Sequence, residues 1–434
     1  MNDIKIRILF EGWRLVQHSY GQVLAFTLTH MYKMYGPEGT LGHKIDFYVK
    51  EAKYYNSKWN DTKKLVYNEE YNSILSRFKN YNGEEVDLIY RQTYPYNISV
   101  SLENRNVPKC IFYTSEYSHL DSSYFEFANP IDDVPIDDYI AYYLSKMNNI
   151  YFTSPSAWSS NGMKRYLSMD DFAQRNRTIA HGVDTTVFFK HDTPSVRDKI
   201  RFDFNVKEDE ILLINVGGAM TSNKGIPQII HALHIMINLM NLTHYKLLLK
   251  GSGDLYFPDH VLNYYFQSFK NDNIMTQKDI DVIQSHILIT NETLSYSQIN
   301  DLYNAADLYI SPYIAEGFGL TMLEALASGL QILVPKTGST KEYIEDIFNN
   351  GGGDEFITYV DSQVIAGPDG NCRNDIKLHD LINSITINET KFKPGLQSHN
   401  YLKMKNYIET EYSWYKISRL LYEYFLDIIR SQQM

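Results

Sequence analysis

Two glutamates eight positions apart, Glu316 and Glu324, have the side-chain type and spacing that suit the binding of a small polar ligand. The apolar periodicity from Gly319 to Ala327 predicts a helix that contains Glu324. One carboxylate then precedes the helix and the other lies inside it, so both can reach a polyol over the helix N-terminus. Carboxylates accept hydrogen bonds from vicinal hydroxyls, and the backbone N–H groups between them suit a diphosphate.

Glycine-rich loops accompany these carboxylates in the sequence. Between the two glutamates lie Gly317, Phe318, Gly319 and Leu320, where the glycines leave backbone N–H groups accessible. Upstream, the loop 217–225 carries Lys224 at the predicted start of a helix, where a cation opposes the helix dipole and therefore indicates a nearby anion. The loop 250–254 ends another predicted strand with Gly251 and Gly253. A solvated lysine in a glycine turn and a plain turn are the alternative interpretations of these two loops.

An alternation of strands and helices must position these loops. In the first half we expect strands at 4–10, 86–90, 109–113, 150–153 and 178–180, and a helix at 21–34. In the second half we expect strands at 211–216, 245–250, 287–289, 308–310 and 331–335, and helices at 224–240, 297–305 and 319–327. This order predicts two α/β domains with parallel sheets, in which ligands bind beyond the carboxyl ends of the strands. The polar stretch 189–209 is predicted to link them, and a helix at 413–430 has one face that must be buried.

Several of these motifs together resemble the family 4 retaining glycosyltransferases. They are the E-x7-E pair with Gly-Phe-Gly inside it, the lysine loop, His181-Gly182-Val183-Asp184 followed by Phe188, and Tyr412-Ser413-Trp414. The resemblance covers about residues 150–345 and resumes at the C-terminus. It implies a GT-B fold, in which two Rossmann-like parallel-sheet domains face each other across a cleft and the C-terminal helix crosses back to the N-terminal domain. The expected domains are 1–190, completed by 412–432, and 205–411.

The resemblance also implies roles for individual residues. Glu316 would contact the transferred sugar, Glu324 the ribose hydroxyls, and Lys224 the diphosphate. The predicted catalytic residues are Glu316, Lys224, Glu116 and His119. The predicted donor-binding residues are Gly12, Arg14, Gly217, Gly218, Lys224, Gly251, Gly317, Phe318, Gly319, Leu320 and Glu324.

At one position this sequence departs from the family pattern. Gly218 stands where the family usually has an arginine, so half of the usual cationic clamp is missing. Hydrogen bonds from Thr221, Ser222 or Asn223 would replace it, or the donor is held differently, or the site has decayed. Arg14 is the other candidate for the lost cation.

The N-terminal half is expected to carry the acceptor and to contact the sugar. Gly12 and Arg14 follow the first strand, where the family has a loop that closes over the donor phosphates. Glu116 and His119 follow the strand ending at Tyr113, where family members often place a histidine near the anomeric carbon. The sequence leaves open which of the two is nearer the reaction, and plain hydrogen bonding or a surface position are the alternatives for all three side chains.

Composition and length limit the class of protein. With 434 residues the chain can form two or three domains, and its net charge of −11 argues against nucleic acid as a partner. Two distant cysteines, Cys110 and Cys372, indicate neither a disulfide framework nor a zinc site. Because no signal peptide and no apolar run of membrane-spanning length occur, we expect a cytoplasmic protein.

The resemblance implies a retaining, hexosyltransferase-like enzyme that needs no metal or other cofactor and takes a UDP- or GDP-sugar as donor. Its partner would be a glycan or another hydroxyl acceptor, free or linked to lipid or protein; peripheral membrane association and oligomeric state stay open. The alternatives are a non-catalytic carbohydrate-binding or assembly protein and a sugar-nucleotide epimerase or hydrolase. Two further motifs, Gly352-Gly353-Asp354-Glu355-Phe356 of diguanylate cyclases and the Asp279-Ile280-Asp281 metal motif, are interpreted as chance.

Overall fold

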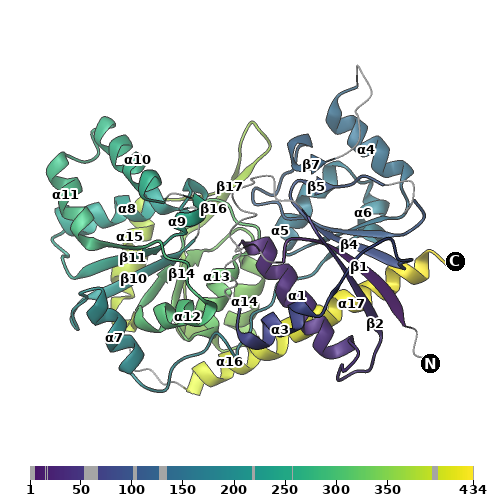
Figure 1. Ribbon diagram of the computed structural model, residues 1–434. Helices are drawn as coiled ribbons and strands as arrows, with labels where there is room; N and C mark the ends of the chain where they lie inside the picture. Colours follow the sequence, from purple (N-terminus) through teal and green to yellow (C-terminus); the bar gives the residue numbers. More distant parts are fainter. Residues whose placement is uncertain are drawn as a thin grey trace. The chain divides into compact units, whose positions relative to one another are not determined.

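The protein is described by a computed structural model that covers residues 5–14, 16, 18–52, 67–100, 105–126, 134–217, 220–256, 258–392 and 399–433. The chain forms two compact units. Unit 1 comprises Met1–Gly182 and Tyr412–Met434, and unit 2 comprises Val183–Glu411. Both are α/β units built on a parallel sheet (Figure 1).

The sheet of unit 1 has seven strands in the order β3-β2-β1-β4-β6-β8-β9, and every pair in it is parallel. The strands are β1 (Ile6–Gly12), β2 (Ile45–Glu51), β3 (Lys79–Asn80), β4 (Leu88–Gln92), β6 (Lys109–Phe112), β8 (Ile150–Ser154) and β9 (Asn176–Thr178). A short separate pair joins β5 (Tyr96–Asn97) to β7 (Phe125–Glu126). The helices are α1 (Ser19–Tyr35), α3 (Glu69–Ser76), α4 (Ile136–Lys146), α5 (Ala157–Ser160), α6 (Met169–Arg175) and α17 (Trp414–Ser431).

The C-terminal helix α17 is part of unit 1. Trp414 stacks on Phe26 of α1 with ring centroids 5.6 Å apart, and Phe425 packs against Tyr90 of β4. The Tyr424 hydroxyl donates a hydrogen bond to the backbone carbonyl of Arg175. The predicted burial of one face of this helix is therefore confirmed, and its cause is the apolar stripe that recurs every three or four residues.

The buried His181 makes the stability of unit 1 depend on pH. His181 lies against Phe112 and Trp414, and burial lowers the pKa of its imidazole from 6.5 to about 3. His181 in the unfolded chain binds a proton as the pH falls through 6.5, whereas His181 in the folded chain stays neutral until about pH 3. The free energy of unfolding is therefore unaffected by His181 above pH 6.5. Between pH 6.5 and 3 it falls by up to about 1.4 kcal/mol per pH unit.

We therefore expect the free energy of unfolding of the wild type to fall more steeply between pH 6.5 and 5 than that of His181→Gln. The expected difference reaches about 2 kcal/mol, because glutamine does not titrate in this range. Urea unfolding at several pH values, followed by tryptophan fluorescence, measures it. Parallel curves for the two proteins would contradict the assignment.

The sheet of unit 2 has six parallel strands in the order β12-β11-β10-β13-β14-β15. They are β10 (Ile211–Val216), β11 (Tyr245–Lys250), β12 (Ile287–Thr290), β13 (Leu308–Ile310), β14 (Ile332–Pro335) and β15 (Ile357–Val360), followed by an antiparallel hairpin of β16 (Ser362–Ala366) and β17 (Cys372–Ile376). The helices are α7 (Ser195–Asp203), α8 (Ile226–His234), α9 (Gly253–Tyr256), α10 (Pro258–Asn271), α11 (Gln277–His286), α12 (Tyr296–Ala305), α13 (Leu320–Ala327), α14 (Lys341–Asn350), α15 (Leu378–Ile387) and α16 (His399–Glu411). Two Rossmann-like parallel-sheet units are thus confirmed.

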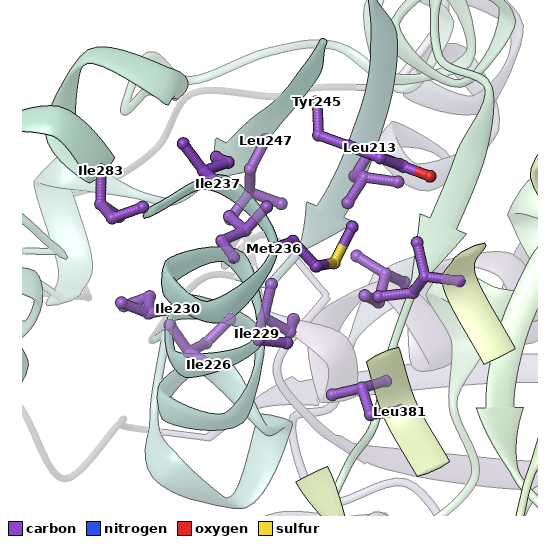
Figure 2. Close-up of a cluster of buried hydrophobic side chains, with 14 of the residues drawn as sticks. Leu213, Ile226, Ile229, Ile230, Met236, Ile237, Tyr245, Leu247, Ile283 and Leu381 are labelled. Atoms are coloured by element: carbon purple, nitrogen blue, oxygen red, sulfur yellow. The ribbon is translucent and has the colours of Figure 1, made fainter. Parts of the chain in front are cut away.

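Helix α8 anchors the core of unit 2. Its isoleucines 226, 229 and 230 belong to one buried cluster with Leu213 of β10, Leu247 of β11 and Leu381 of α15 (Figure 2). These side chains recur at the helical period on α8 and at every second residue on the strands, which is why the sequence pattern predicted both elements. The predicted helix 224–240 is divided in the structure, because it begins as the 3-10 helix η3 (Ser222–Lys224) and ends as the π-helix η4 (Ile235–Leu239).

Residues 189–209, interpreted from sequence as a linker, contain α7 and belong to the fold of unit 2. Arg197 and Arg201 of α7 both form ion pairs with the buried carboxylate of Asp307, which precedes β13. This paired cluster explains how a strongly charged segment can pack onto a sheet. None of the helices that the structure describes combines the length and apolar composition of a membrane-spanning segment.

Candidate donor-binding site

The segment between β13 and α13 carries Glu316 and is held by the lysine loop. The backbone N–H groups of Ile314 and Ala315 both donate to the carbonyl of Asn223, at 2.7 and 3.2 Å. The amide of Asn223 in turn donates to the carbonyl of Ala315 at 3.4 Å. Two loops about 90 positions apart in sequence are therefore fixed to each other by hydrogen bonds of their backbones and of the Asn223 amide.

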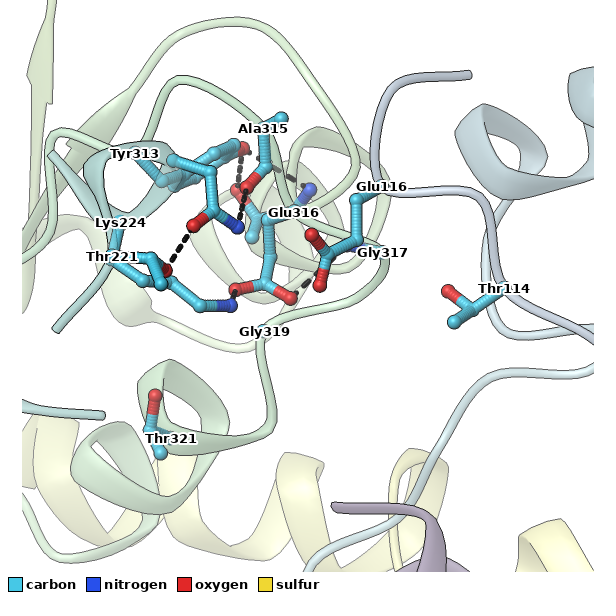
Figure 3. Close-up of polar contacts among 12 residues, drawn as sticks. Thr114, Glu116, Thr221, Lys224, Tyr313, Ala315, Glu316, Gly317, Gly319 and Thr321 are labelled. Atoms are coloured by element: carbon cyan, nitrogen blue, oxygen red, sulfur yellow. Dashed lines mark hydrogen bonds and ion pairs between the residues drawn. The ribbon is translucent and has the colours of Figure 1, made fainter. Parts of the chain in front are cut away.

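These contacts bring two predicted catalytic residues together. Lys224 Nζ forms an ion pair with the Glu316 carboxylate, as Figure 3 shows. The other oxygen of Glu316 accepts a hydrogen bond from the backbone N–H of Gly317 at 3.0 Å. The side chains are 27% and 15% exposed, so solvent screens this pair only in part and ligands can still reach it.

Two glycines make this close packing of loops possible. Gly225 has a φ of +76°, and a Cβ there would lie 2.2 Å from the carbonyl oxygen of Pro312. Gly319 has a φ of +92°, and its Cβ would lie 2.4 Å from Cε of Met322. Only glycine adopts such a backbone readily and leaves room for the neighbouring atoms.

Helix α13 begins directly after Gly319, which has no side chain to cap its first turn. Leu320 is the first helical residue, and the hydroxyls of Thr321 and Tyr309 lie 2.7 Å apart, so they tie this turn to β13. Before the helix, Phe318 stacks on Tyr343 with ring centroids 4.7 Å apart. The N-terminus of α13 is thus held firmly, and helix N-termini attract anions.

The second glutamate lies inside the helix and is buried. Glu324 is 4% exposed, and the hydroxyl of Tyr303 on α12 donates to its carboxylate at 3.2 Å. Glu324 is therefore not a solvated residue on the surface of the helix. A buried carboxylate needs hydrogen-bond donors, and Tyr303 supplies one that the sequence alone did not identify.

The lysine loop also contacts the loop 250–254, at the carboxyl ends of β10 and β11. The backbone N–H of Gly217 donates to the carbonyl of Lys250 at 3.1 Å. A Cβ on Gly251 would lie 2.9 Å from Cε of Met220, so the two loops are in close contact. Gly218, at which the family arginine is missing, lies outside the described residues.

The predicted donor-binding residues of unit 1 have structural partners within that unit. A Cβ on Gly12 would lie 2.7 Å from the carbonyl oxygen of Gln92, which explains a glycine at the end of β1. Arg14 donates from its backbone N–H and from Nε to Glu51, both at 3.0 Å, and from Nη1 to the carbonyl of Leu75. The guanidinium of Arg14 is therefore engaged in holding the loop after β1 to its neighbours.

Glu116 and His119 follow β6 in a tight turn of unit 1. The indole N–H of Trp158 donates to the carbonyl of Glu116 at 2.7 Å, and the hydroxyl of Ser115 donates to the carbonyl of His119 at 2.8 Å. Both side chains are half-buried. Burial above all, with the charge of Glu116 among further causes, raises the pKa of the Tyr20 hydroxyl well above its usual value. The backbone contacts fix the turn, and the roles of both side chains stay predictions.

Sequence reasoning missed one residue that supports the Glu316 loop. Asn374 of β17 is buried, donates from its backbone N–H to the carbonyl of Ile314 at 2.8 Å, and donates from its amide to the carbonyl of Tyr313 at 3.3 Å. Its amide oxygen accepts a hydrogen bond from the Thr337 hydroxyl at 2.9 Å. No local pattern marks an asparagine in a short hairpin as the partner of a loop 60 positions earlier.

We expect Asn374→Ala to destabilise unit 2 by about 1–3 kcal/mol, because it removes the amide that donates to the carbonyl of Tyr313 and accepts from the half-buried Thr337 hydroxyl. Val364→Ala is the matched control, since Val364 lies opposite Asn374 in the hairpin and is exposed. Urea unfolding of the two variants measures the difference. Equal midpoints would contradict the supporting role of Asn374.

The two motifs interpreted as chance take part in ordinary local structure. Asp279 forms a capping box with Thr276 at the start of α11. The segment Gly353–Glu355 is a short 3-10 helix, and Glu355 accepts a hydrogen bond from the side chain of Asn400. Within the described part of the chain, no group of three or more His, Cys, Asp and Glu side chains is placed to hold a metal ion.

One segment of the chain matches a known protein family. Residues 196–351 match the family described as "Glycosyl transferases group 1", and this segment contains Lys224, Glu316 and Glu324. An uncharacterized glycosyltransferase of Methanocaldococcus jannaschii is 27% identical over 157 residues, which are 36% of this chain and 35% of that protein. The chain thus matches about a third of the length of this relative.

Solved structures match nearly the whole chain at low identity. A glycosyltransferase from Rickettsia africae is 14% identical with a TM-score of 0.62, and the match covers 98% of this chain and 99% of that one. HepE of Anabaena, solved in complex with UDP and glucose, is 12% identical with a TM-score of 0.58, covering 97% and 100%. The fold is that of the GT-B glycosyltransferases, and residues 196–351 are similar to the glycosyl transferases group 1 family.

Proposed function

We propose that this protein is a retaining glycosyltransferase that moves a sugar from a nucleoside-diphosphate sugar to a hydroxyl acceptor. The observation that carries the proposal is the pairing of Lys224 with Glu316 immediately before α13, together with Glu324 inside the same helix. A cation, an uncapped helix N-terminus and two carboxylates suit the diphosphate and the hydroxyls of one ligand.

In this proposal the donor diphosphate lies at the N-terminus of α13. The backbone N–H groups that follow Gly319, the helix dipole and Lys224 would stabilise the negative charge that grows on the departing diphosphate. Because Lys224 is already held by Glu316, its ammonium group is positioned before the donor arrives. Such preorganisation avoids a reorganisation cost during the reaction.

The two carboxylates would bind different parts of the donor. Glu316 would accept hydrogen bonds from hydroxyls of the transferred sugar, and Glu324 from those of the ribose. The hydroxyl of Tyr303 supports the second role, because it fixes the orientation of the Glu324 carboxylate. Each of these contacts also raises specificity, since a donor that lacks the hydroxyl would leave a carboxylate without a partner.

The configuration of the anomeric carbon would be retained because the acceptor oxygen attacks the same face of the sugar from which the diphosphate departs. The bond between the anomeric carbon and the phosphate oxygen breaks, the bond to the acceptor oxygen forms, and the acceptor proton moves to the departing phosphate. Chemistry of this kind needs no side-chain base and no metal ion. Unit 1 would bind the acceptor, and its residues Glu116 and His119 are the candidates for contacts to the sugar.

The donor we propose is a UDP- or GDP-sugar. The presence of UDP and glucose in the HepE structure supports a uridine nucleotide as the first to test. A thermal-shift screen of nucleotide sugars tests the proposal, because a ligand at 100 times its dissociation constant stabilises the folded state by about 2.7 kcal/mol. We expect one nucleotide sugar to raise the melting temperature and to yield a glycosylated product only with an acceptor. The absence of any shift with UDP-, GDP- and ADP-sugars would contradict it.

A further inference from the structure

Lys250, the last residue of β11, is a buried cation to which the mechanism above gives no role. It is 5% exposed, and its Nζ donates a hydrogen bond to the carbonyl of Gly251. An ammonium group has three N–H donors, and among the described residues no acidic side chain forms an ion pair with this one. Burial accordingly lowers the pKa of Lys250 to about 8. A charge held in this way calls for an anionic partner.

The ammonium group lies at the ligand-binding edge of the sheet. The carbonyl that it contacts belongs to the residue after the strand, so Nζ lies beyond the carboxyl end of β11. Side chains alternate along a strand, and Leu247 and Leu249 both enter the core cluster around α8. The side chain of Lys250 therefore projects from the opposite face of the sheet.

That face is also the one on which α13 begins. On β13, Leu308 and Ile310 enter the core cluster, whereas Tyr309 between them contacts Thr321 in the first turn of α13. Strand β10 separates β11 from β13, so Lys250 and this helix start are two strand intervals apart, about 10 Å. A nucleoside diphosphate is long enough to span that distance.

A second polar group beside Lys250 supports a ligand there. Ser252 is 6% exposed, and its buried hydroxyl has no hydrogen-bond partner among the described residues. Between the two, Gly251 lies so close to Asn291 that an added Cβ would be 2.7 Å from its amide oxygen. A buried hydroxyl without a partner is rare, because losing its hydrogen bonds to water destabilises the fold.

We propose that Lys250 and the Ser252 hydroxyl contact the diphosphate of the sugar-nucleotide donor, so that Lys250 supplies the second cation beside Lys224. The inference rests on the proposed function. Lys250 would take the place of the family arginine that is missing at position 218. Arg14, the other candidate for this role, is paired with Glu51 in unit 1. The backbone hydrogen bond from Gly217 to Lys250 places this turn beside the lysine loop.

The test compares Lys250→Met with Lys246→Met in the full chain. Lys246 is the matched control, because it lies on the same strand and face but nearer the amino end, where Nζ donates to the carbonyl of Ser285. Titration calorimetry with UDP, GDP and ADP, and competition with the corresponding nucleosides, gives the dissociation constants. We expect Lys250→Met to weaken binding of the preferred diphosphate about 10- to 100-fold, which is the range for a hydrogen bond to a charged group.

The nucleoside should bind Lys250→Met and the wild type equally, and Lys246→Met should bind both ligands as the wild type does. Ser252→Ala should weaken diphosphate binding about 2- to 10-fold. Lys250→Gln, which keeps a polar side chain, is the second variant if the methionine protein does not fold. The melting temperature of the ligand-free Lys250→Met protein should equal or exceed that of the wild type, because a buried charge is removed.

Each contrary outcome has a distinct meaning. Wild-type affinity for the diphosphate in the Lys250 variants overturns the inference and leaves the proposed function intact. An equal loss for diphosphate and nucleoside also overturns it, since Lys250 would then act on the base or the ribose. If the wild type binds none of the three diphosphates, the proposed function fails and the inference with it.

Discussion

Glu316→Gln lowers the rate of sugar transfer by about 100- to 1000-fold while the protein binds the nucleoside diphosphate within a few-fold of the wild-type affinity. This expected result follows from the position of Glu316 at the start of α13, where its carboxylate pairs with Lys224. Glutamine preserves the size of the side chain but removes the charge that would hold the sugar hydroxyls as the bond breaks. Losses of this magnitude are typical when one group that stabilises a transition state is removed.

Transfer of labelled sugar from the donor found in the thermal-shift screen measures this rate. Glu342→Gln on α14 is the control, because Glu342 is exposed and has no place in the proposed site. A Glu316→Gln protein with the turnover of the wild type would remove Glu316 from the mechanism. A rate that falls only because the diphosphate no longer binds would move its role from the sugar to the phosphates.

Lys224→Met should lower kcat/KM for the donor by about 100- to 1000-fold. Unlike Glu316→Gln, it should also weaken binding of the diphosphate by about 10-fold or more. This loss corresponds to the roughly 1.5–3 kcal/mol that a hydrogen bond to a charged group contributes. Lys224 is the cation of the lysine loop, and its ion pair with Glu316 fixes its position just before α13. Removing it also leaves the Glu316 carboxylate without its partner, which adds like-charge repulsion to the incoming diphosphate.

Steady-state kinetics and titration of the diphosphate measure both effects, with Lys341→Met on the exposed start of α14 as the control. Because Lys224 and Glu316 are in direct contact, the double variant should lose less than the product of the two single losses. Unchanged affinity for the diphosphate in Lys224→Met would contradict the assignment of this lysine to the phosphates.

The sequence predicted most of the parallel strands because they are continuous apolar runs. Strand β10, for example, is Ile-Leu-Leu-Ile-Asn-Val, a composition typical of strands covered on both faces. Strand β2 was not predicted, because Asp46, Tyr48 and Lys50 alternate with its apolar residues and leave the strand only half-buried. The hairpin of β16 and β17 was not predicted either, because its strands are short and mostly exposed.

The structure does not show the linker predicted at 189–209, because buried ion pairs hold this charged segment in unit 2. The segment 189–209 resembled a linker because charges are usually solvated, yet Arg197 and Arg201 pack by sharing Asp307 more than 100 positions away. A pairing across such a separation depends on the order of strands in the sheet. No local pattern encodes it.

The candidate site could be located from sequence, but its contacts could not. The spacing of Glu316 and Glu324 and the glycines between them pointed to the start of α13. The ion pair of Glu316 with Lys224 joins residues 92 positions apart and emerges only when β10 and β13 become neighbours in the sheet. Lys250 was visible as the cation that ends an apolar strand, although only the adjoining Gly251 was chosen as a binding residue.

The most direct test of the central claim is a crystal structure of the wild-type protein with the nucleoside diphosphate that gives the largest thermal shift. The account predicts phosphate oxygens within hydrogen-bond distance of Lys224 and of the backbone N–H groups after Gly319, and ribose hydroxyls on the Glu324 carboxylate. A nucleotide bound elsewhere, with Lys224 and Glu324 untouched, would contradict the account.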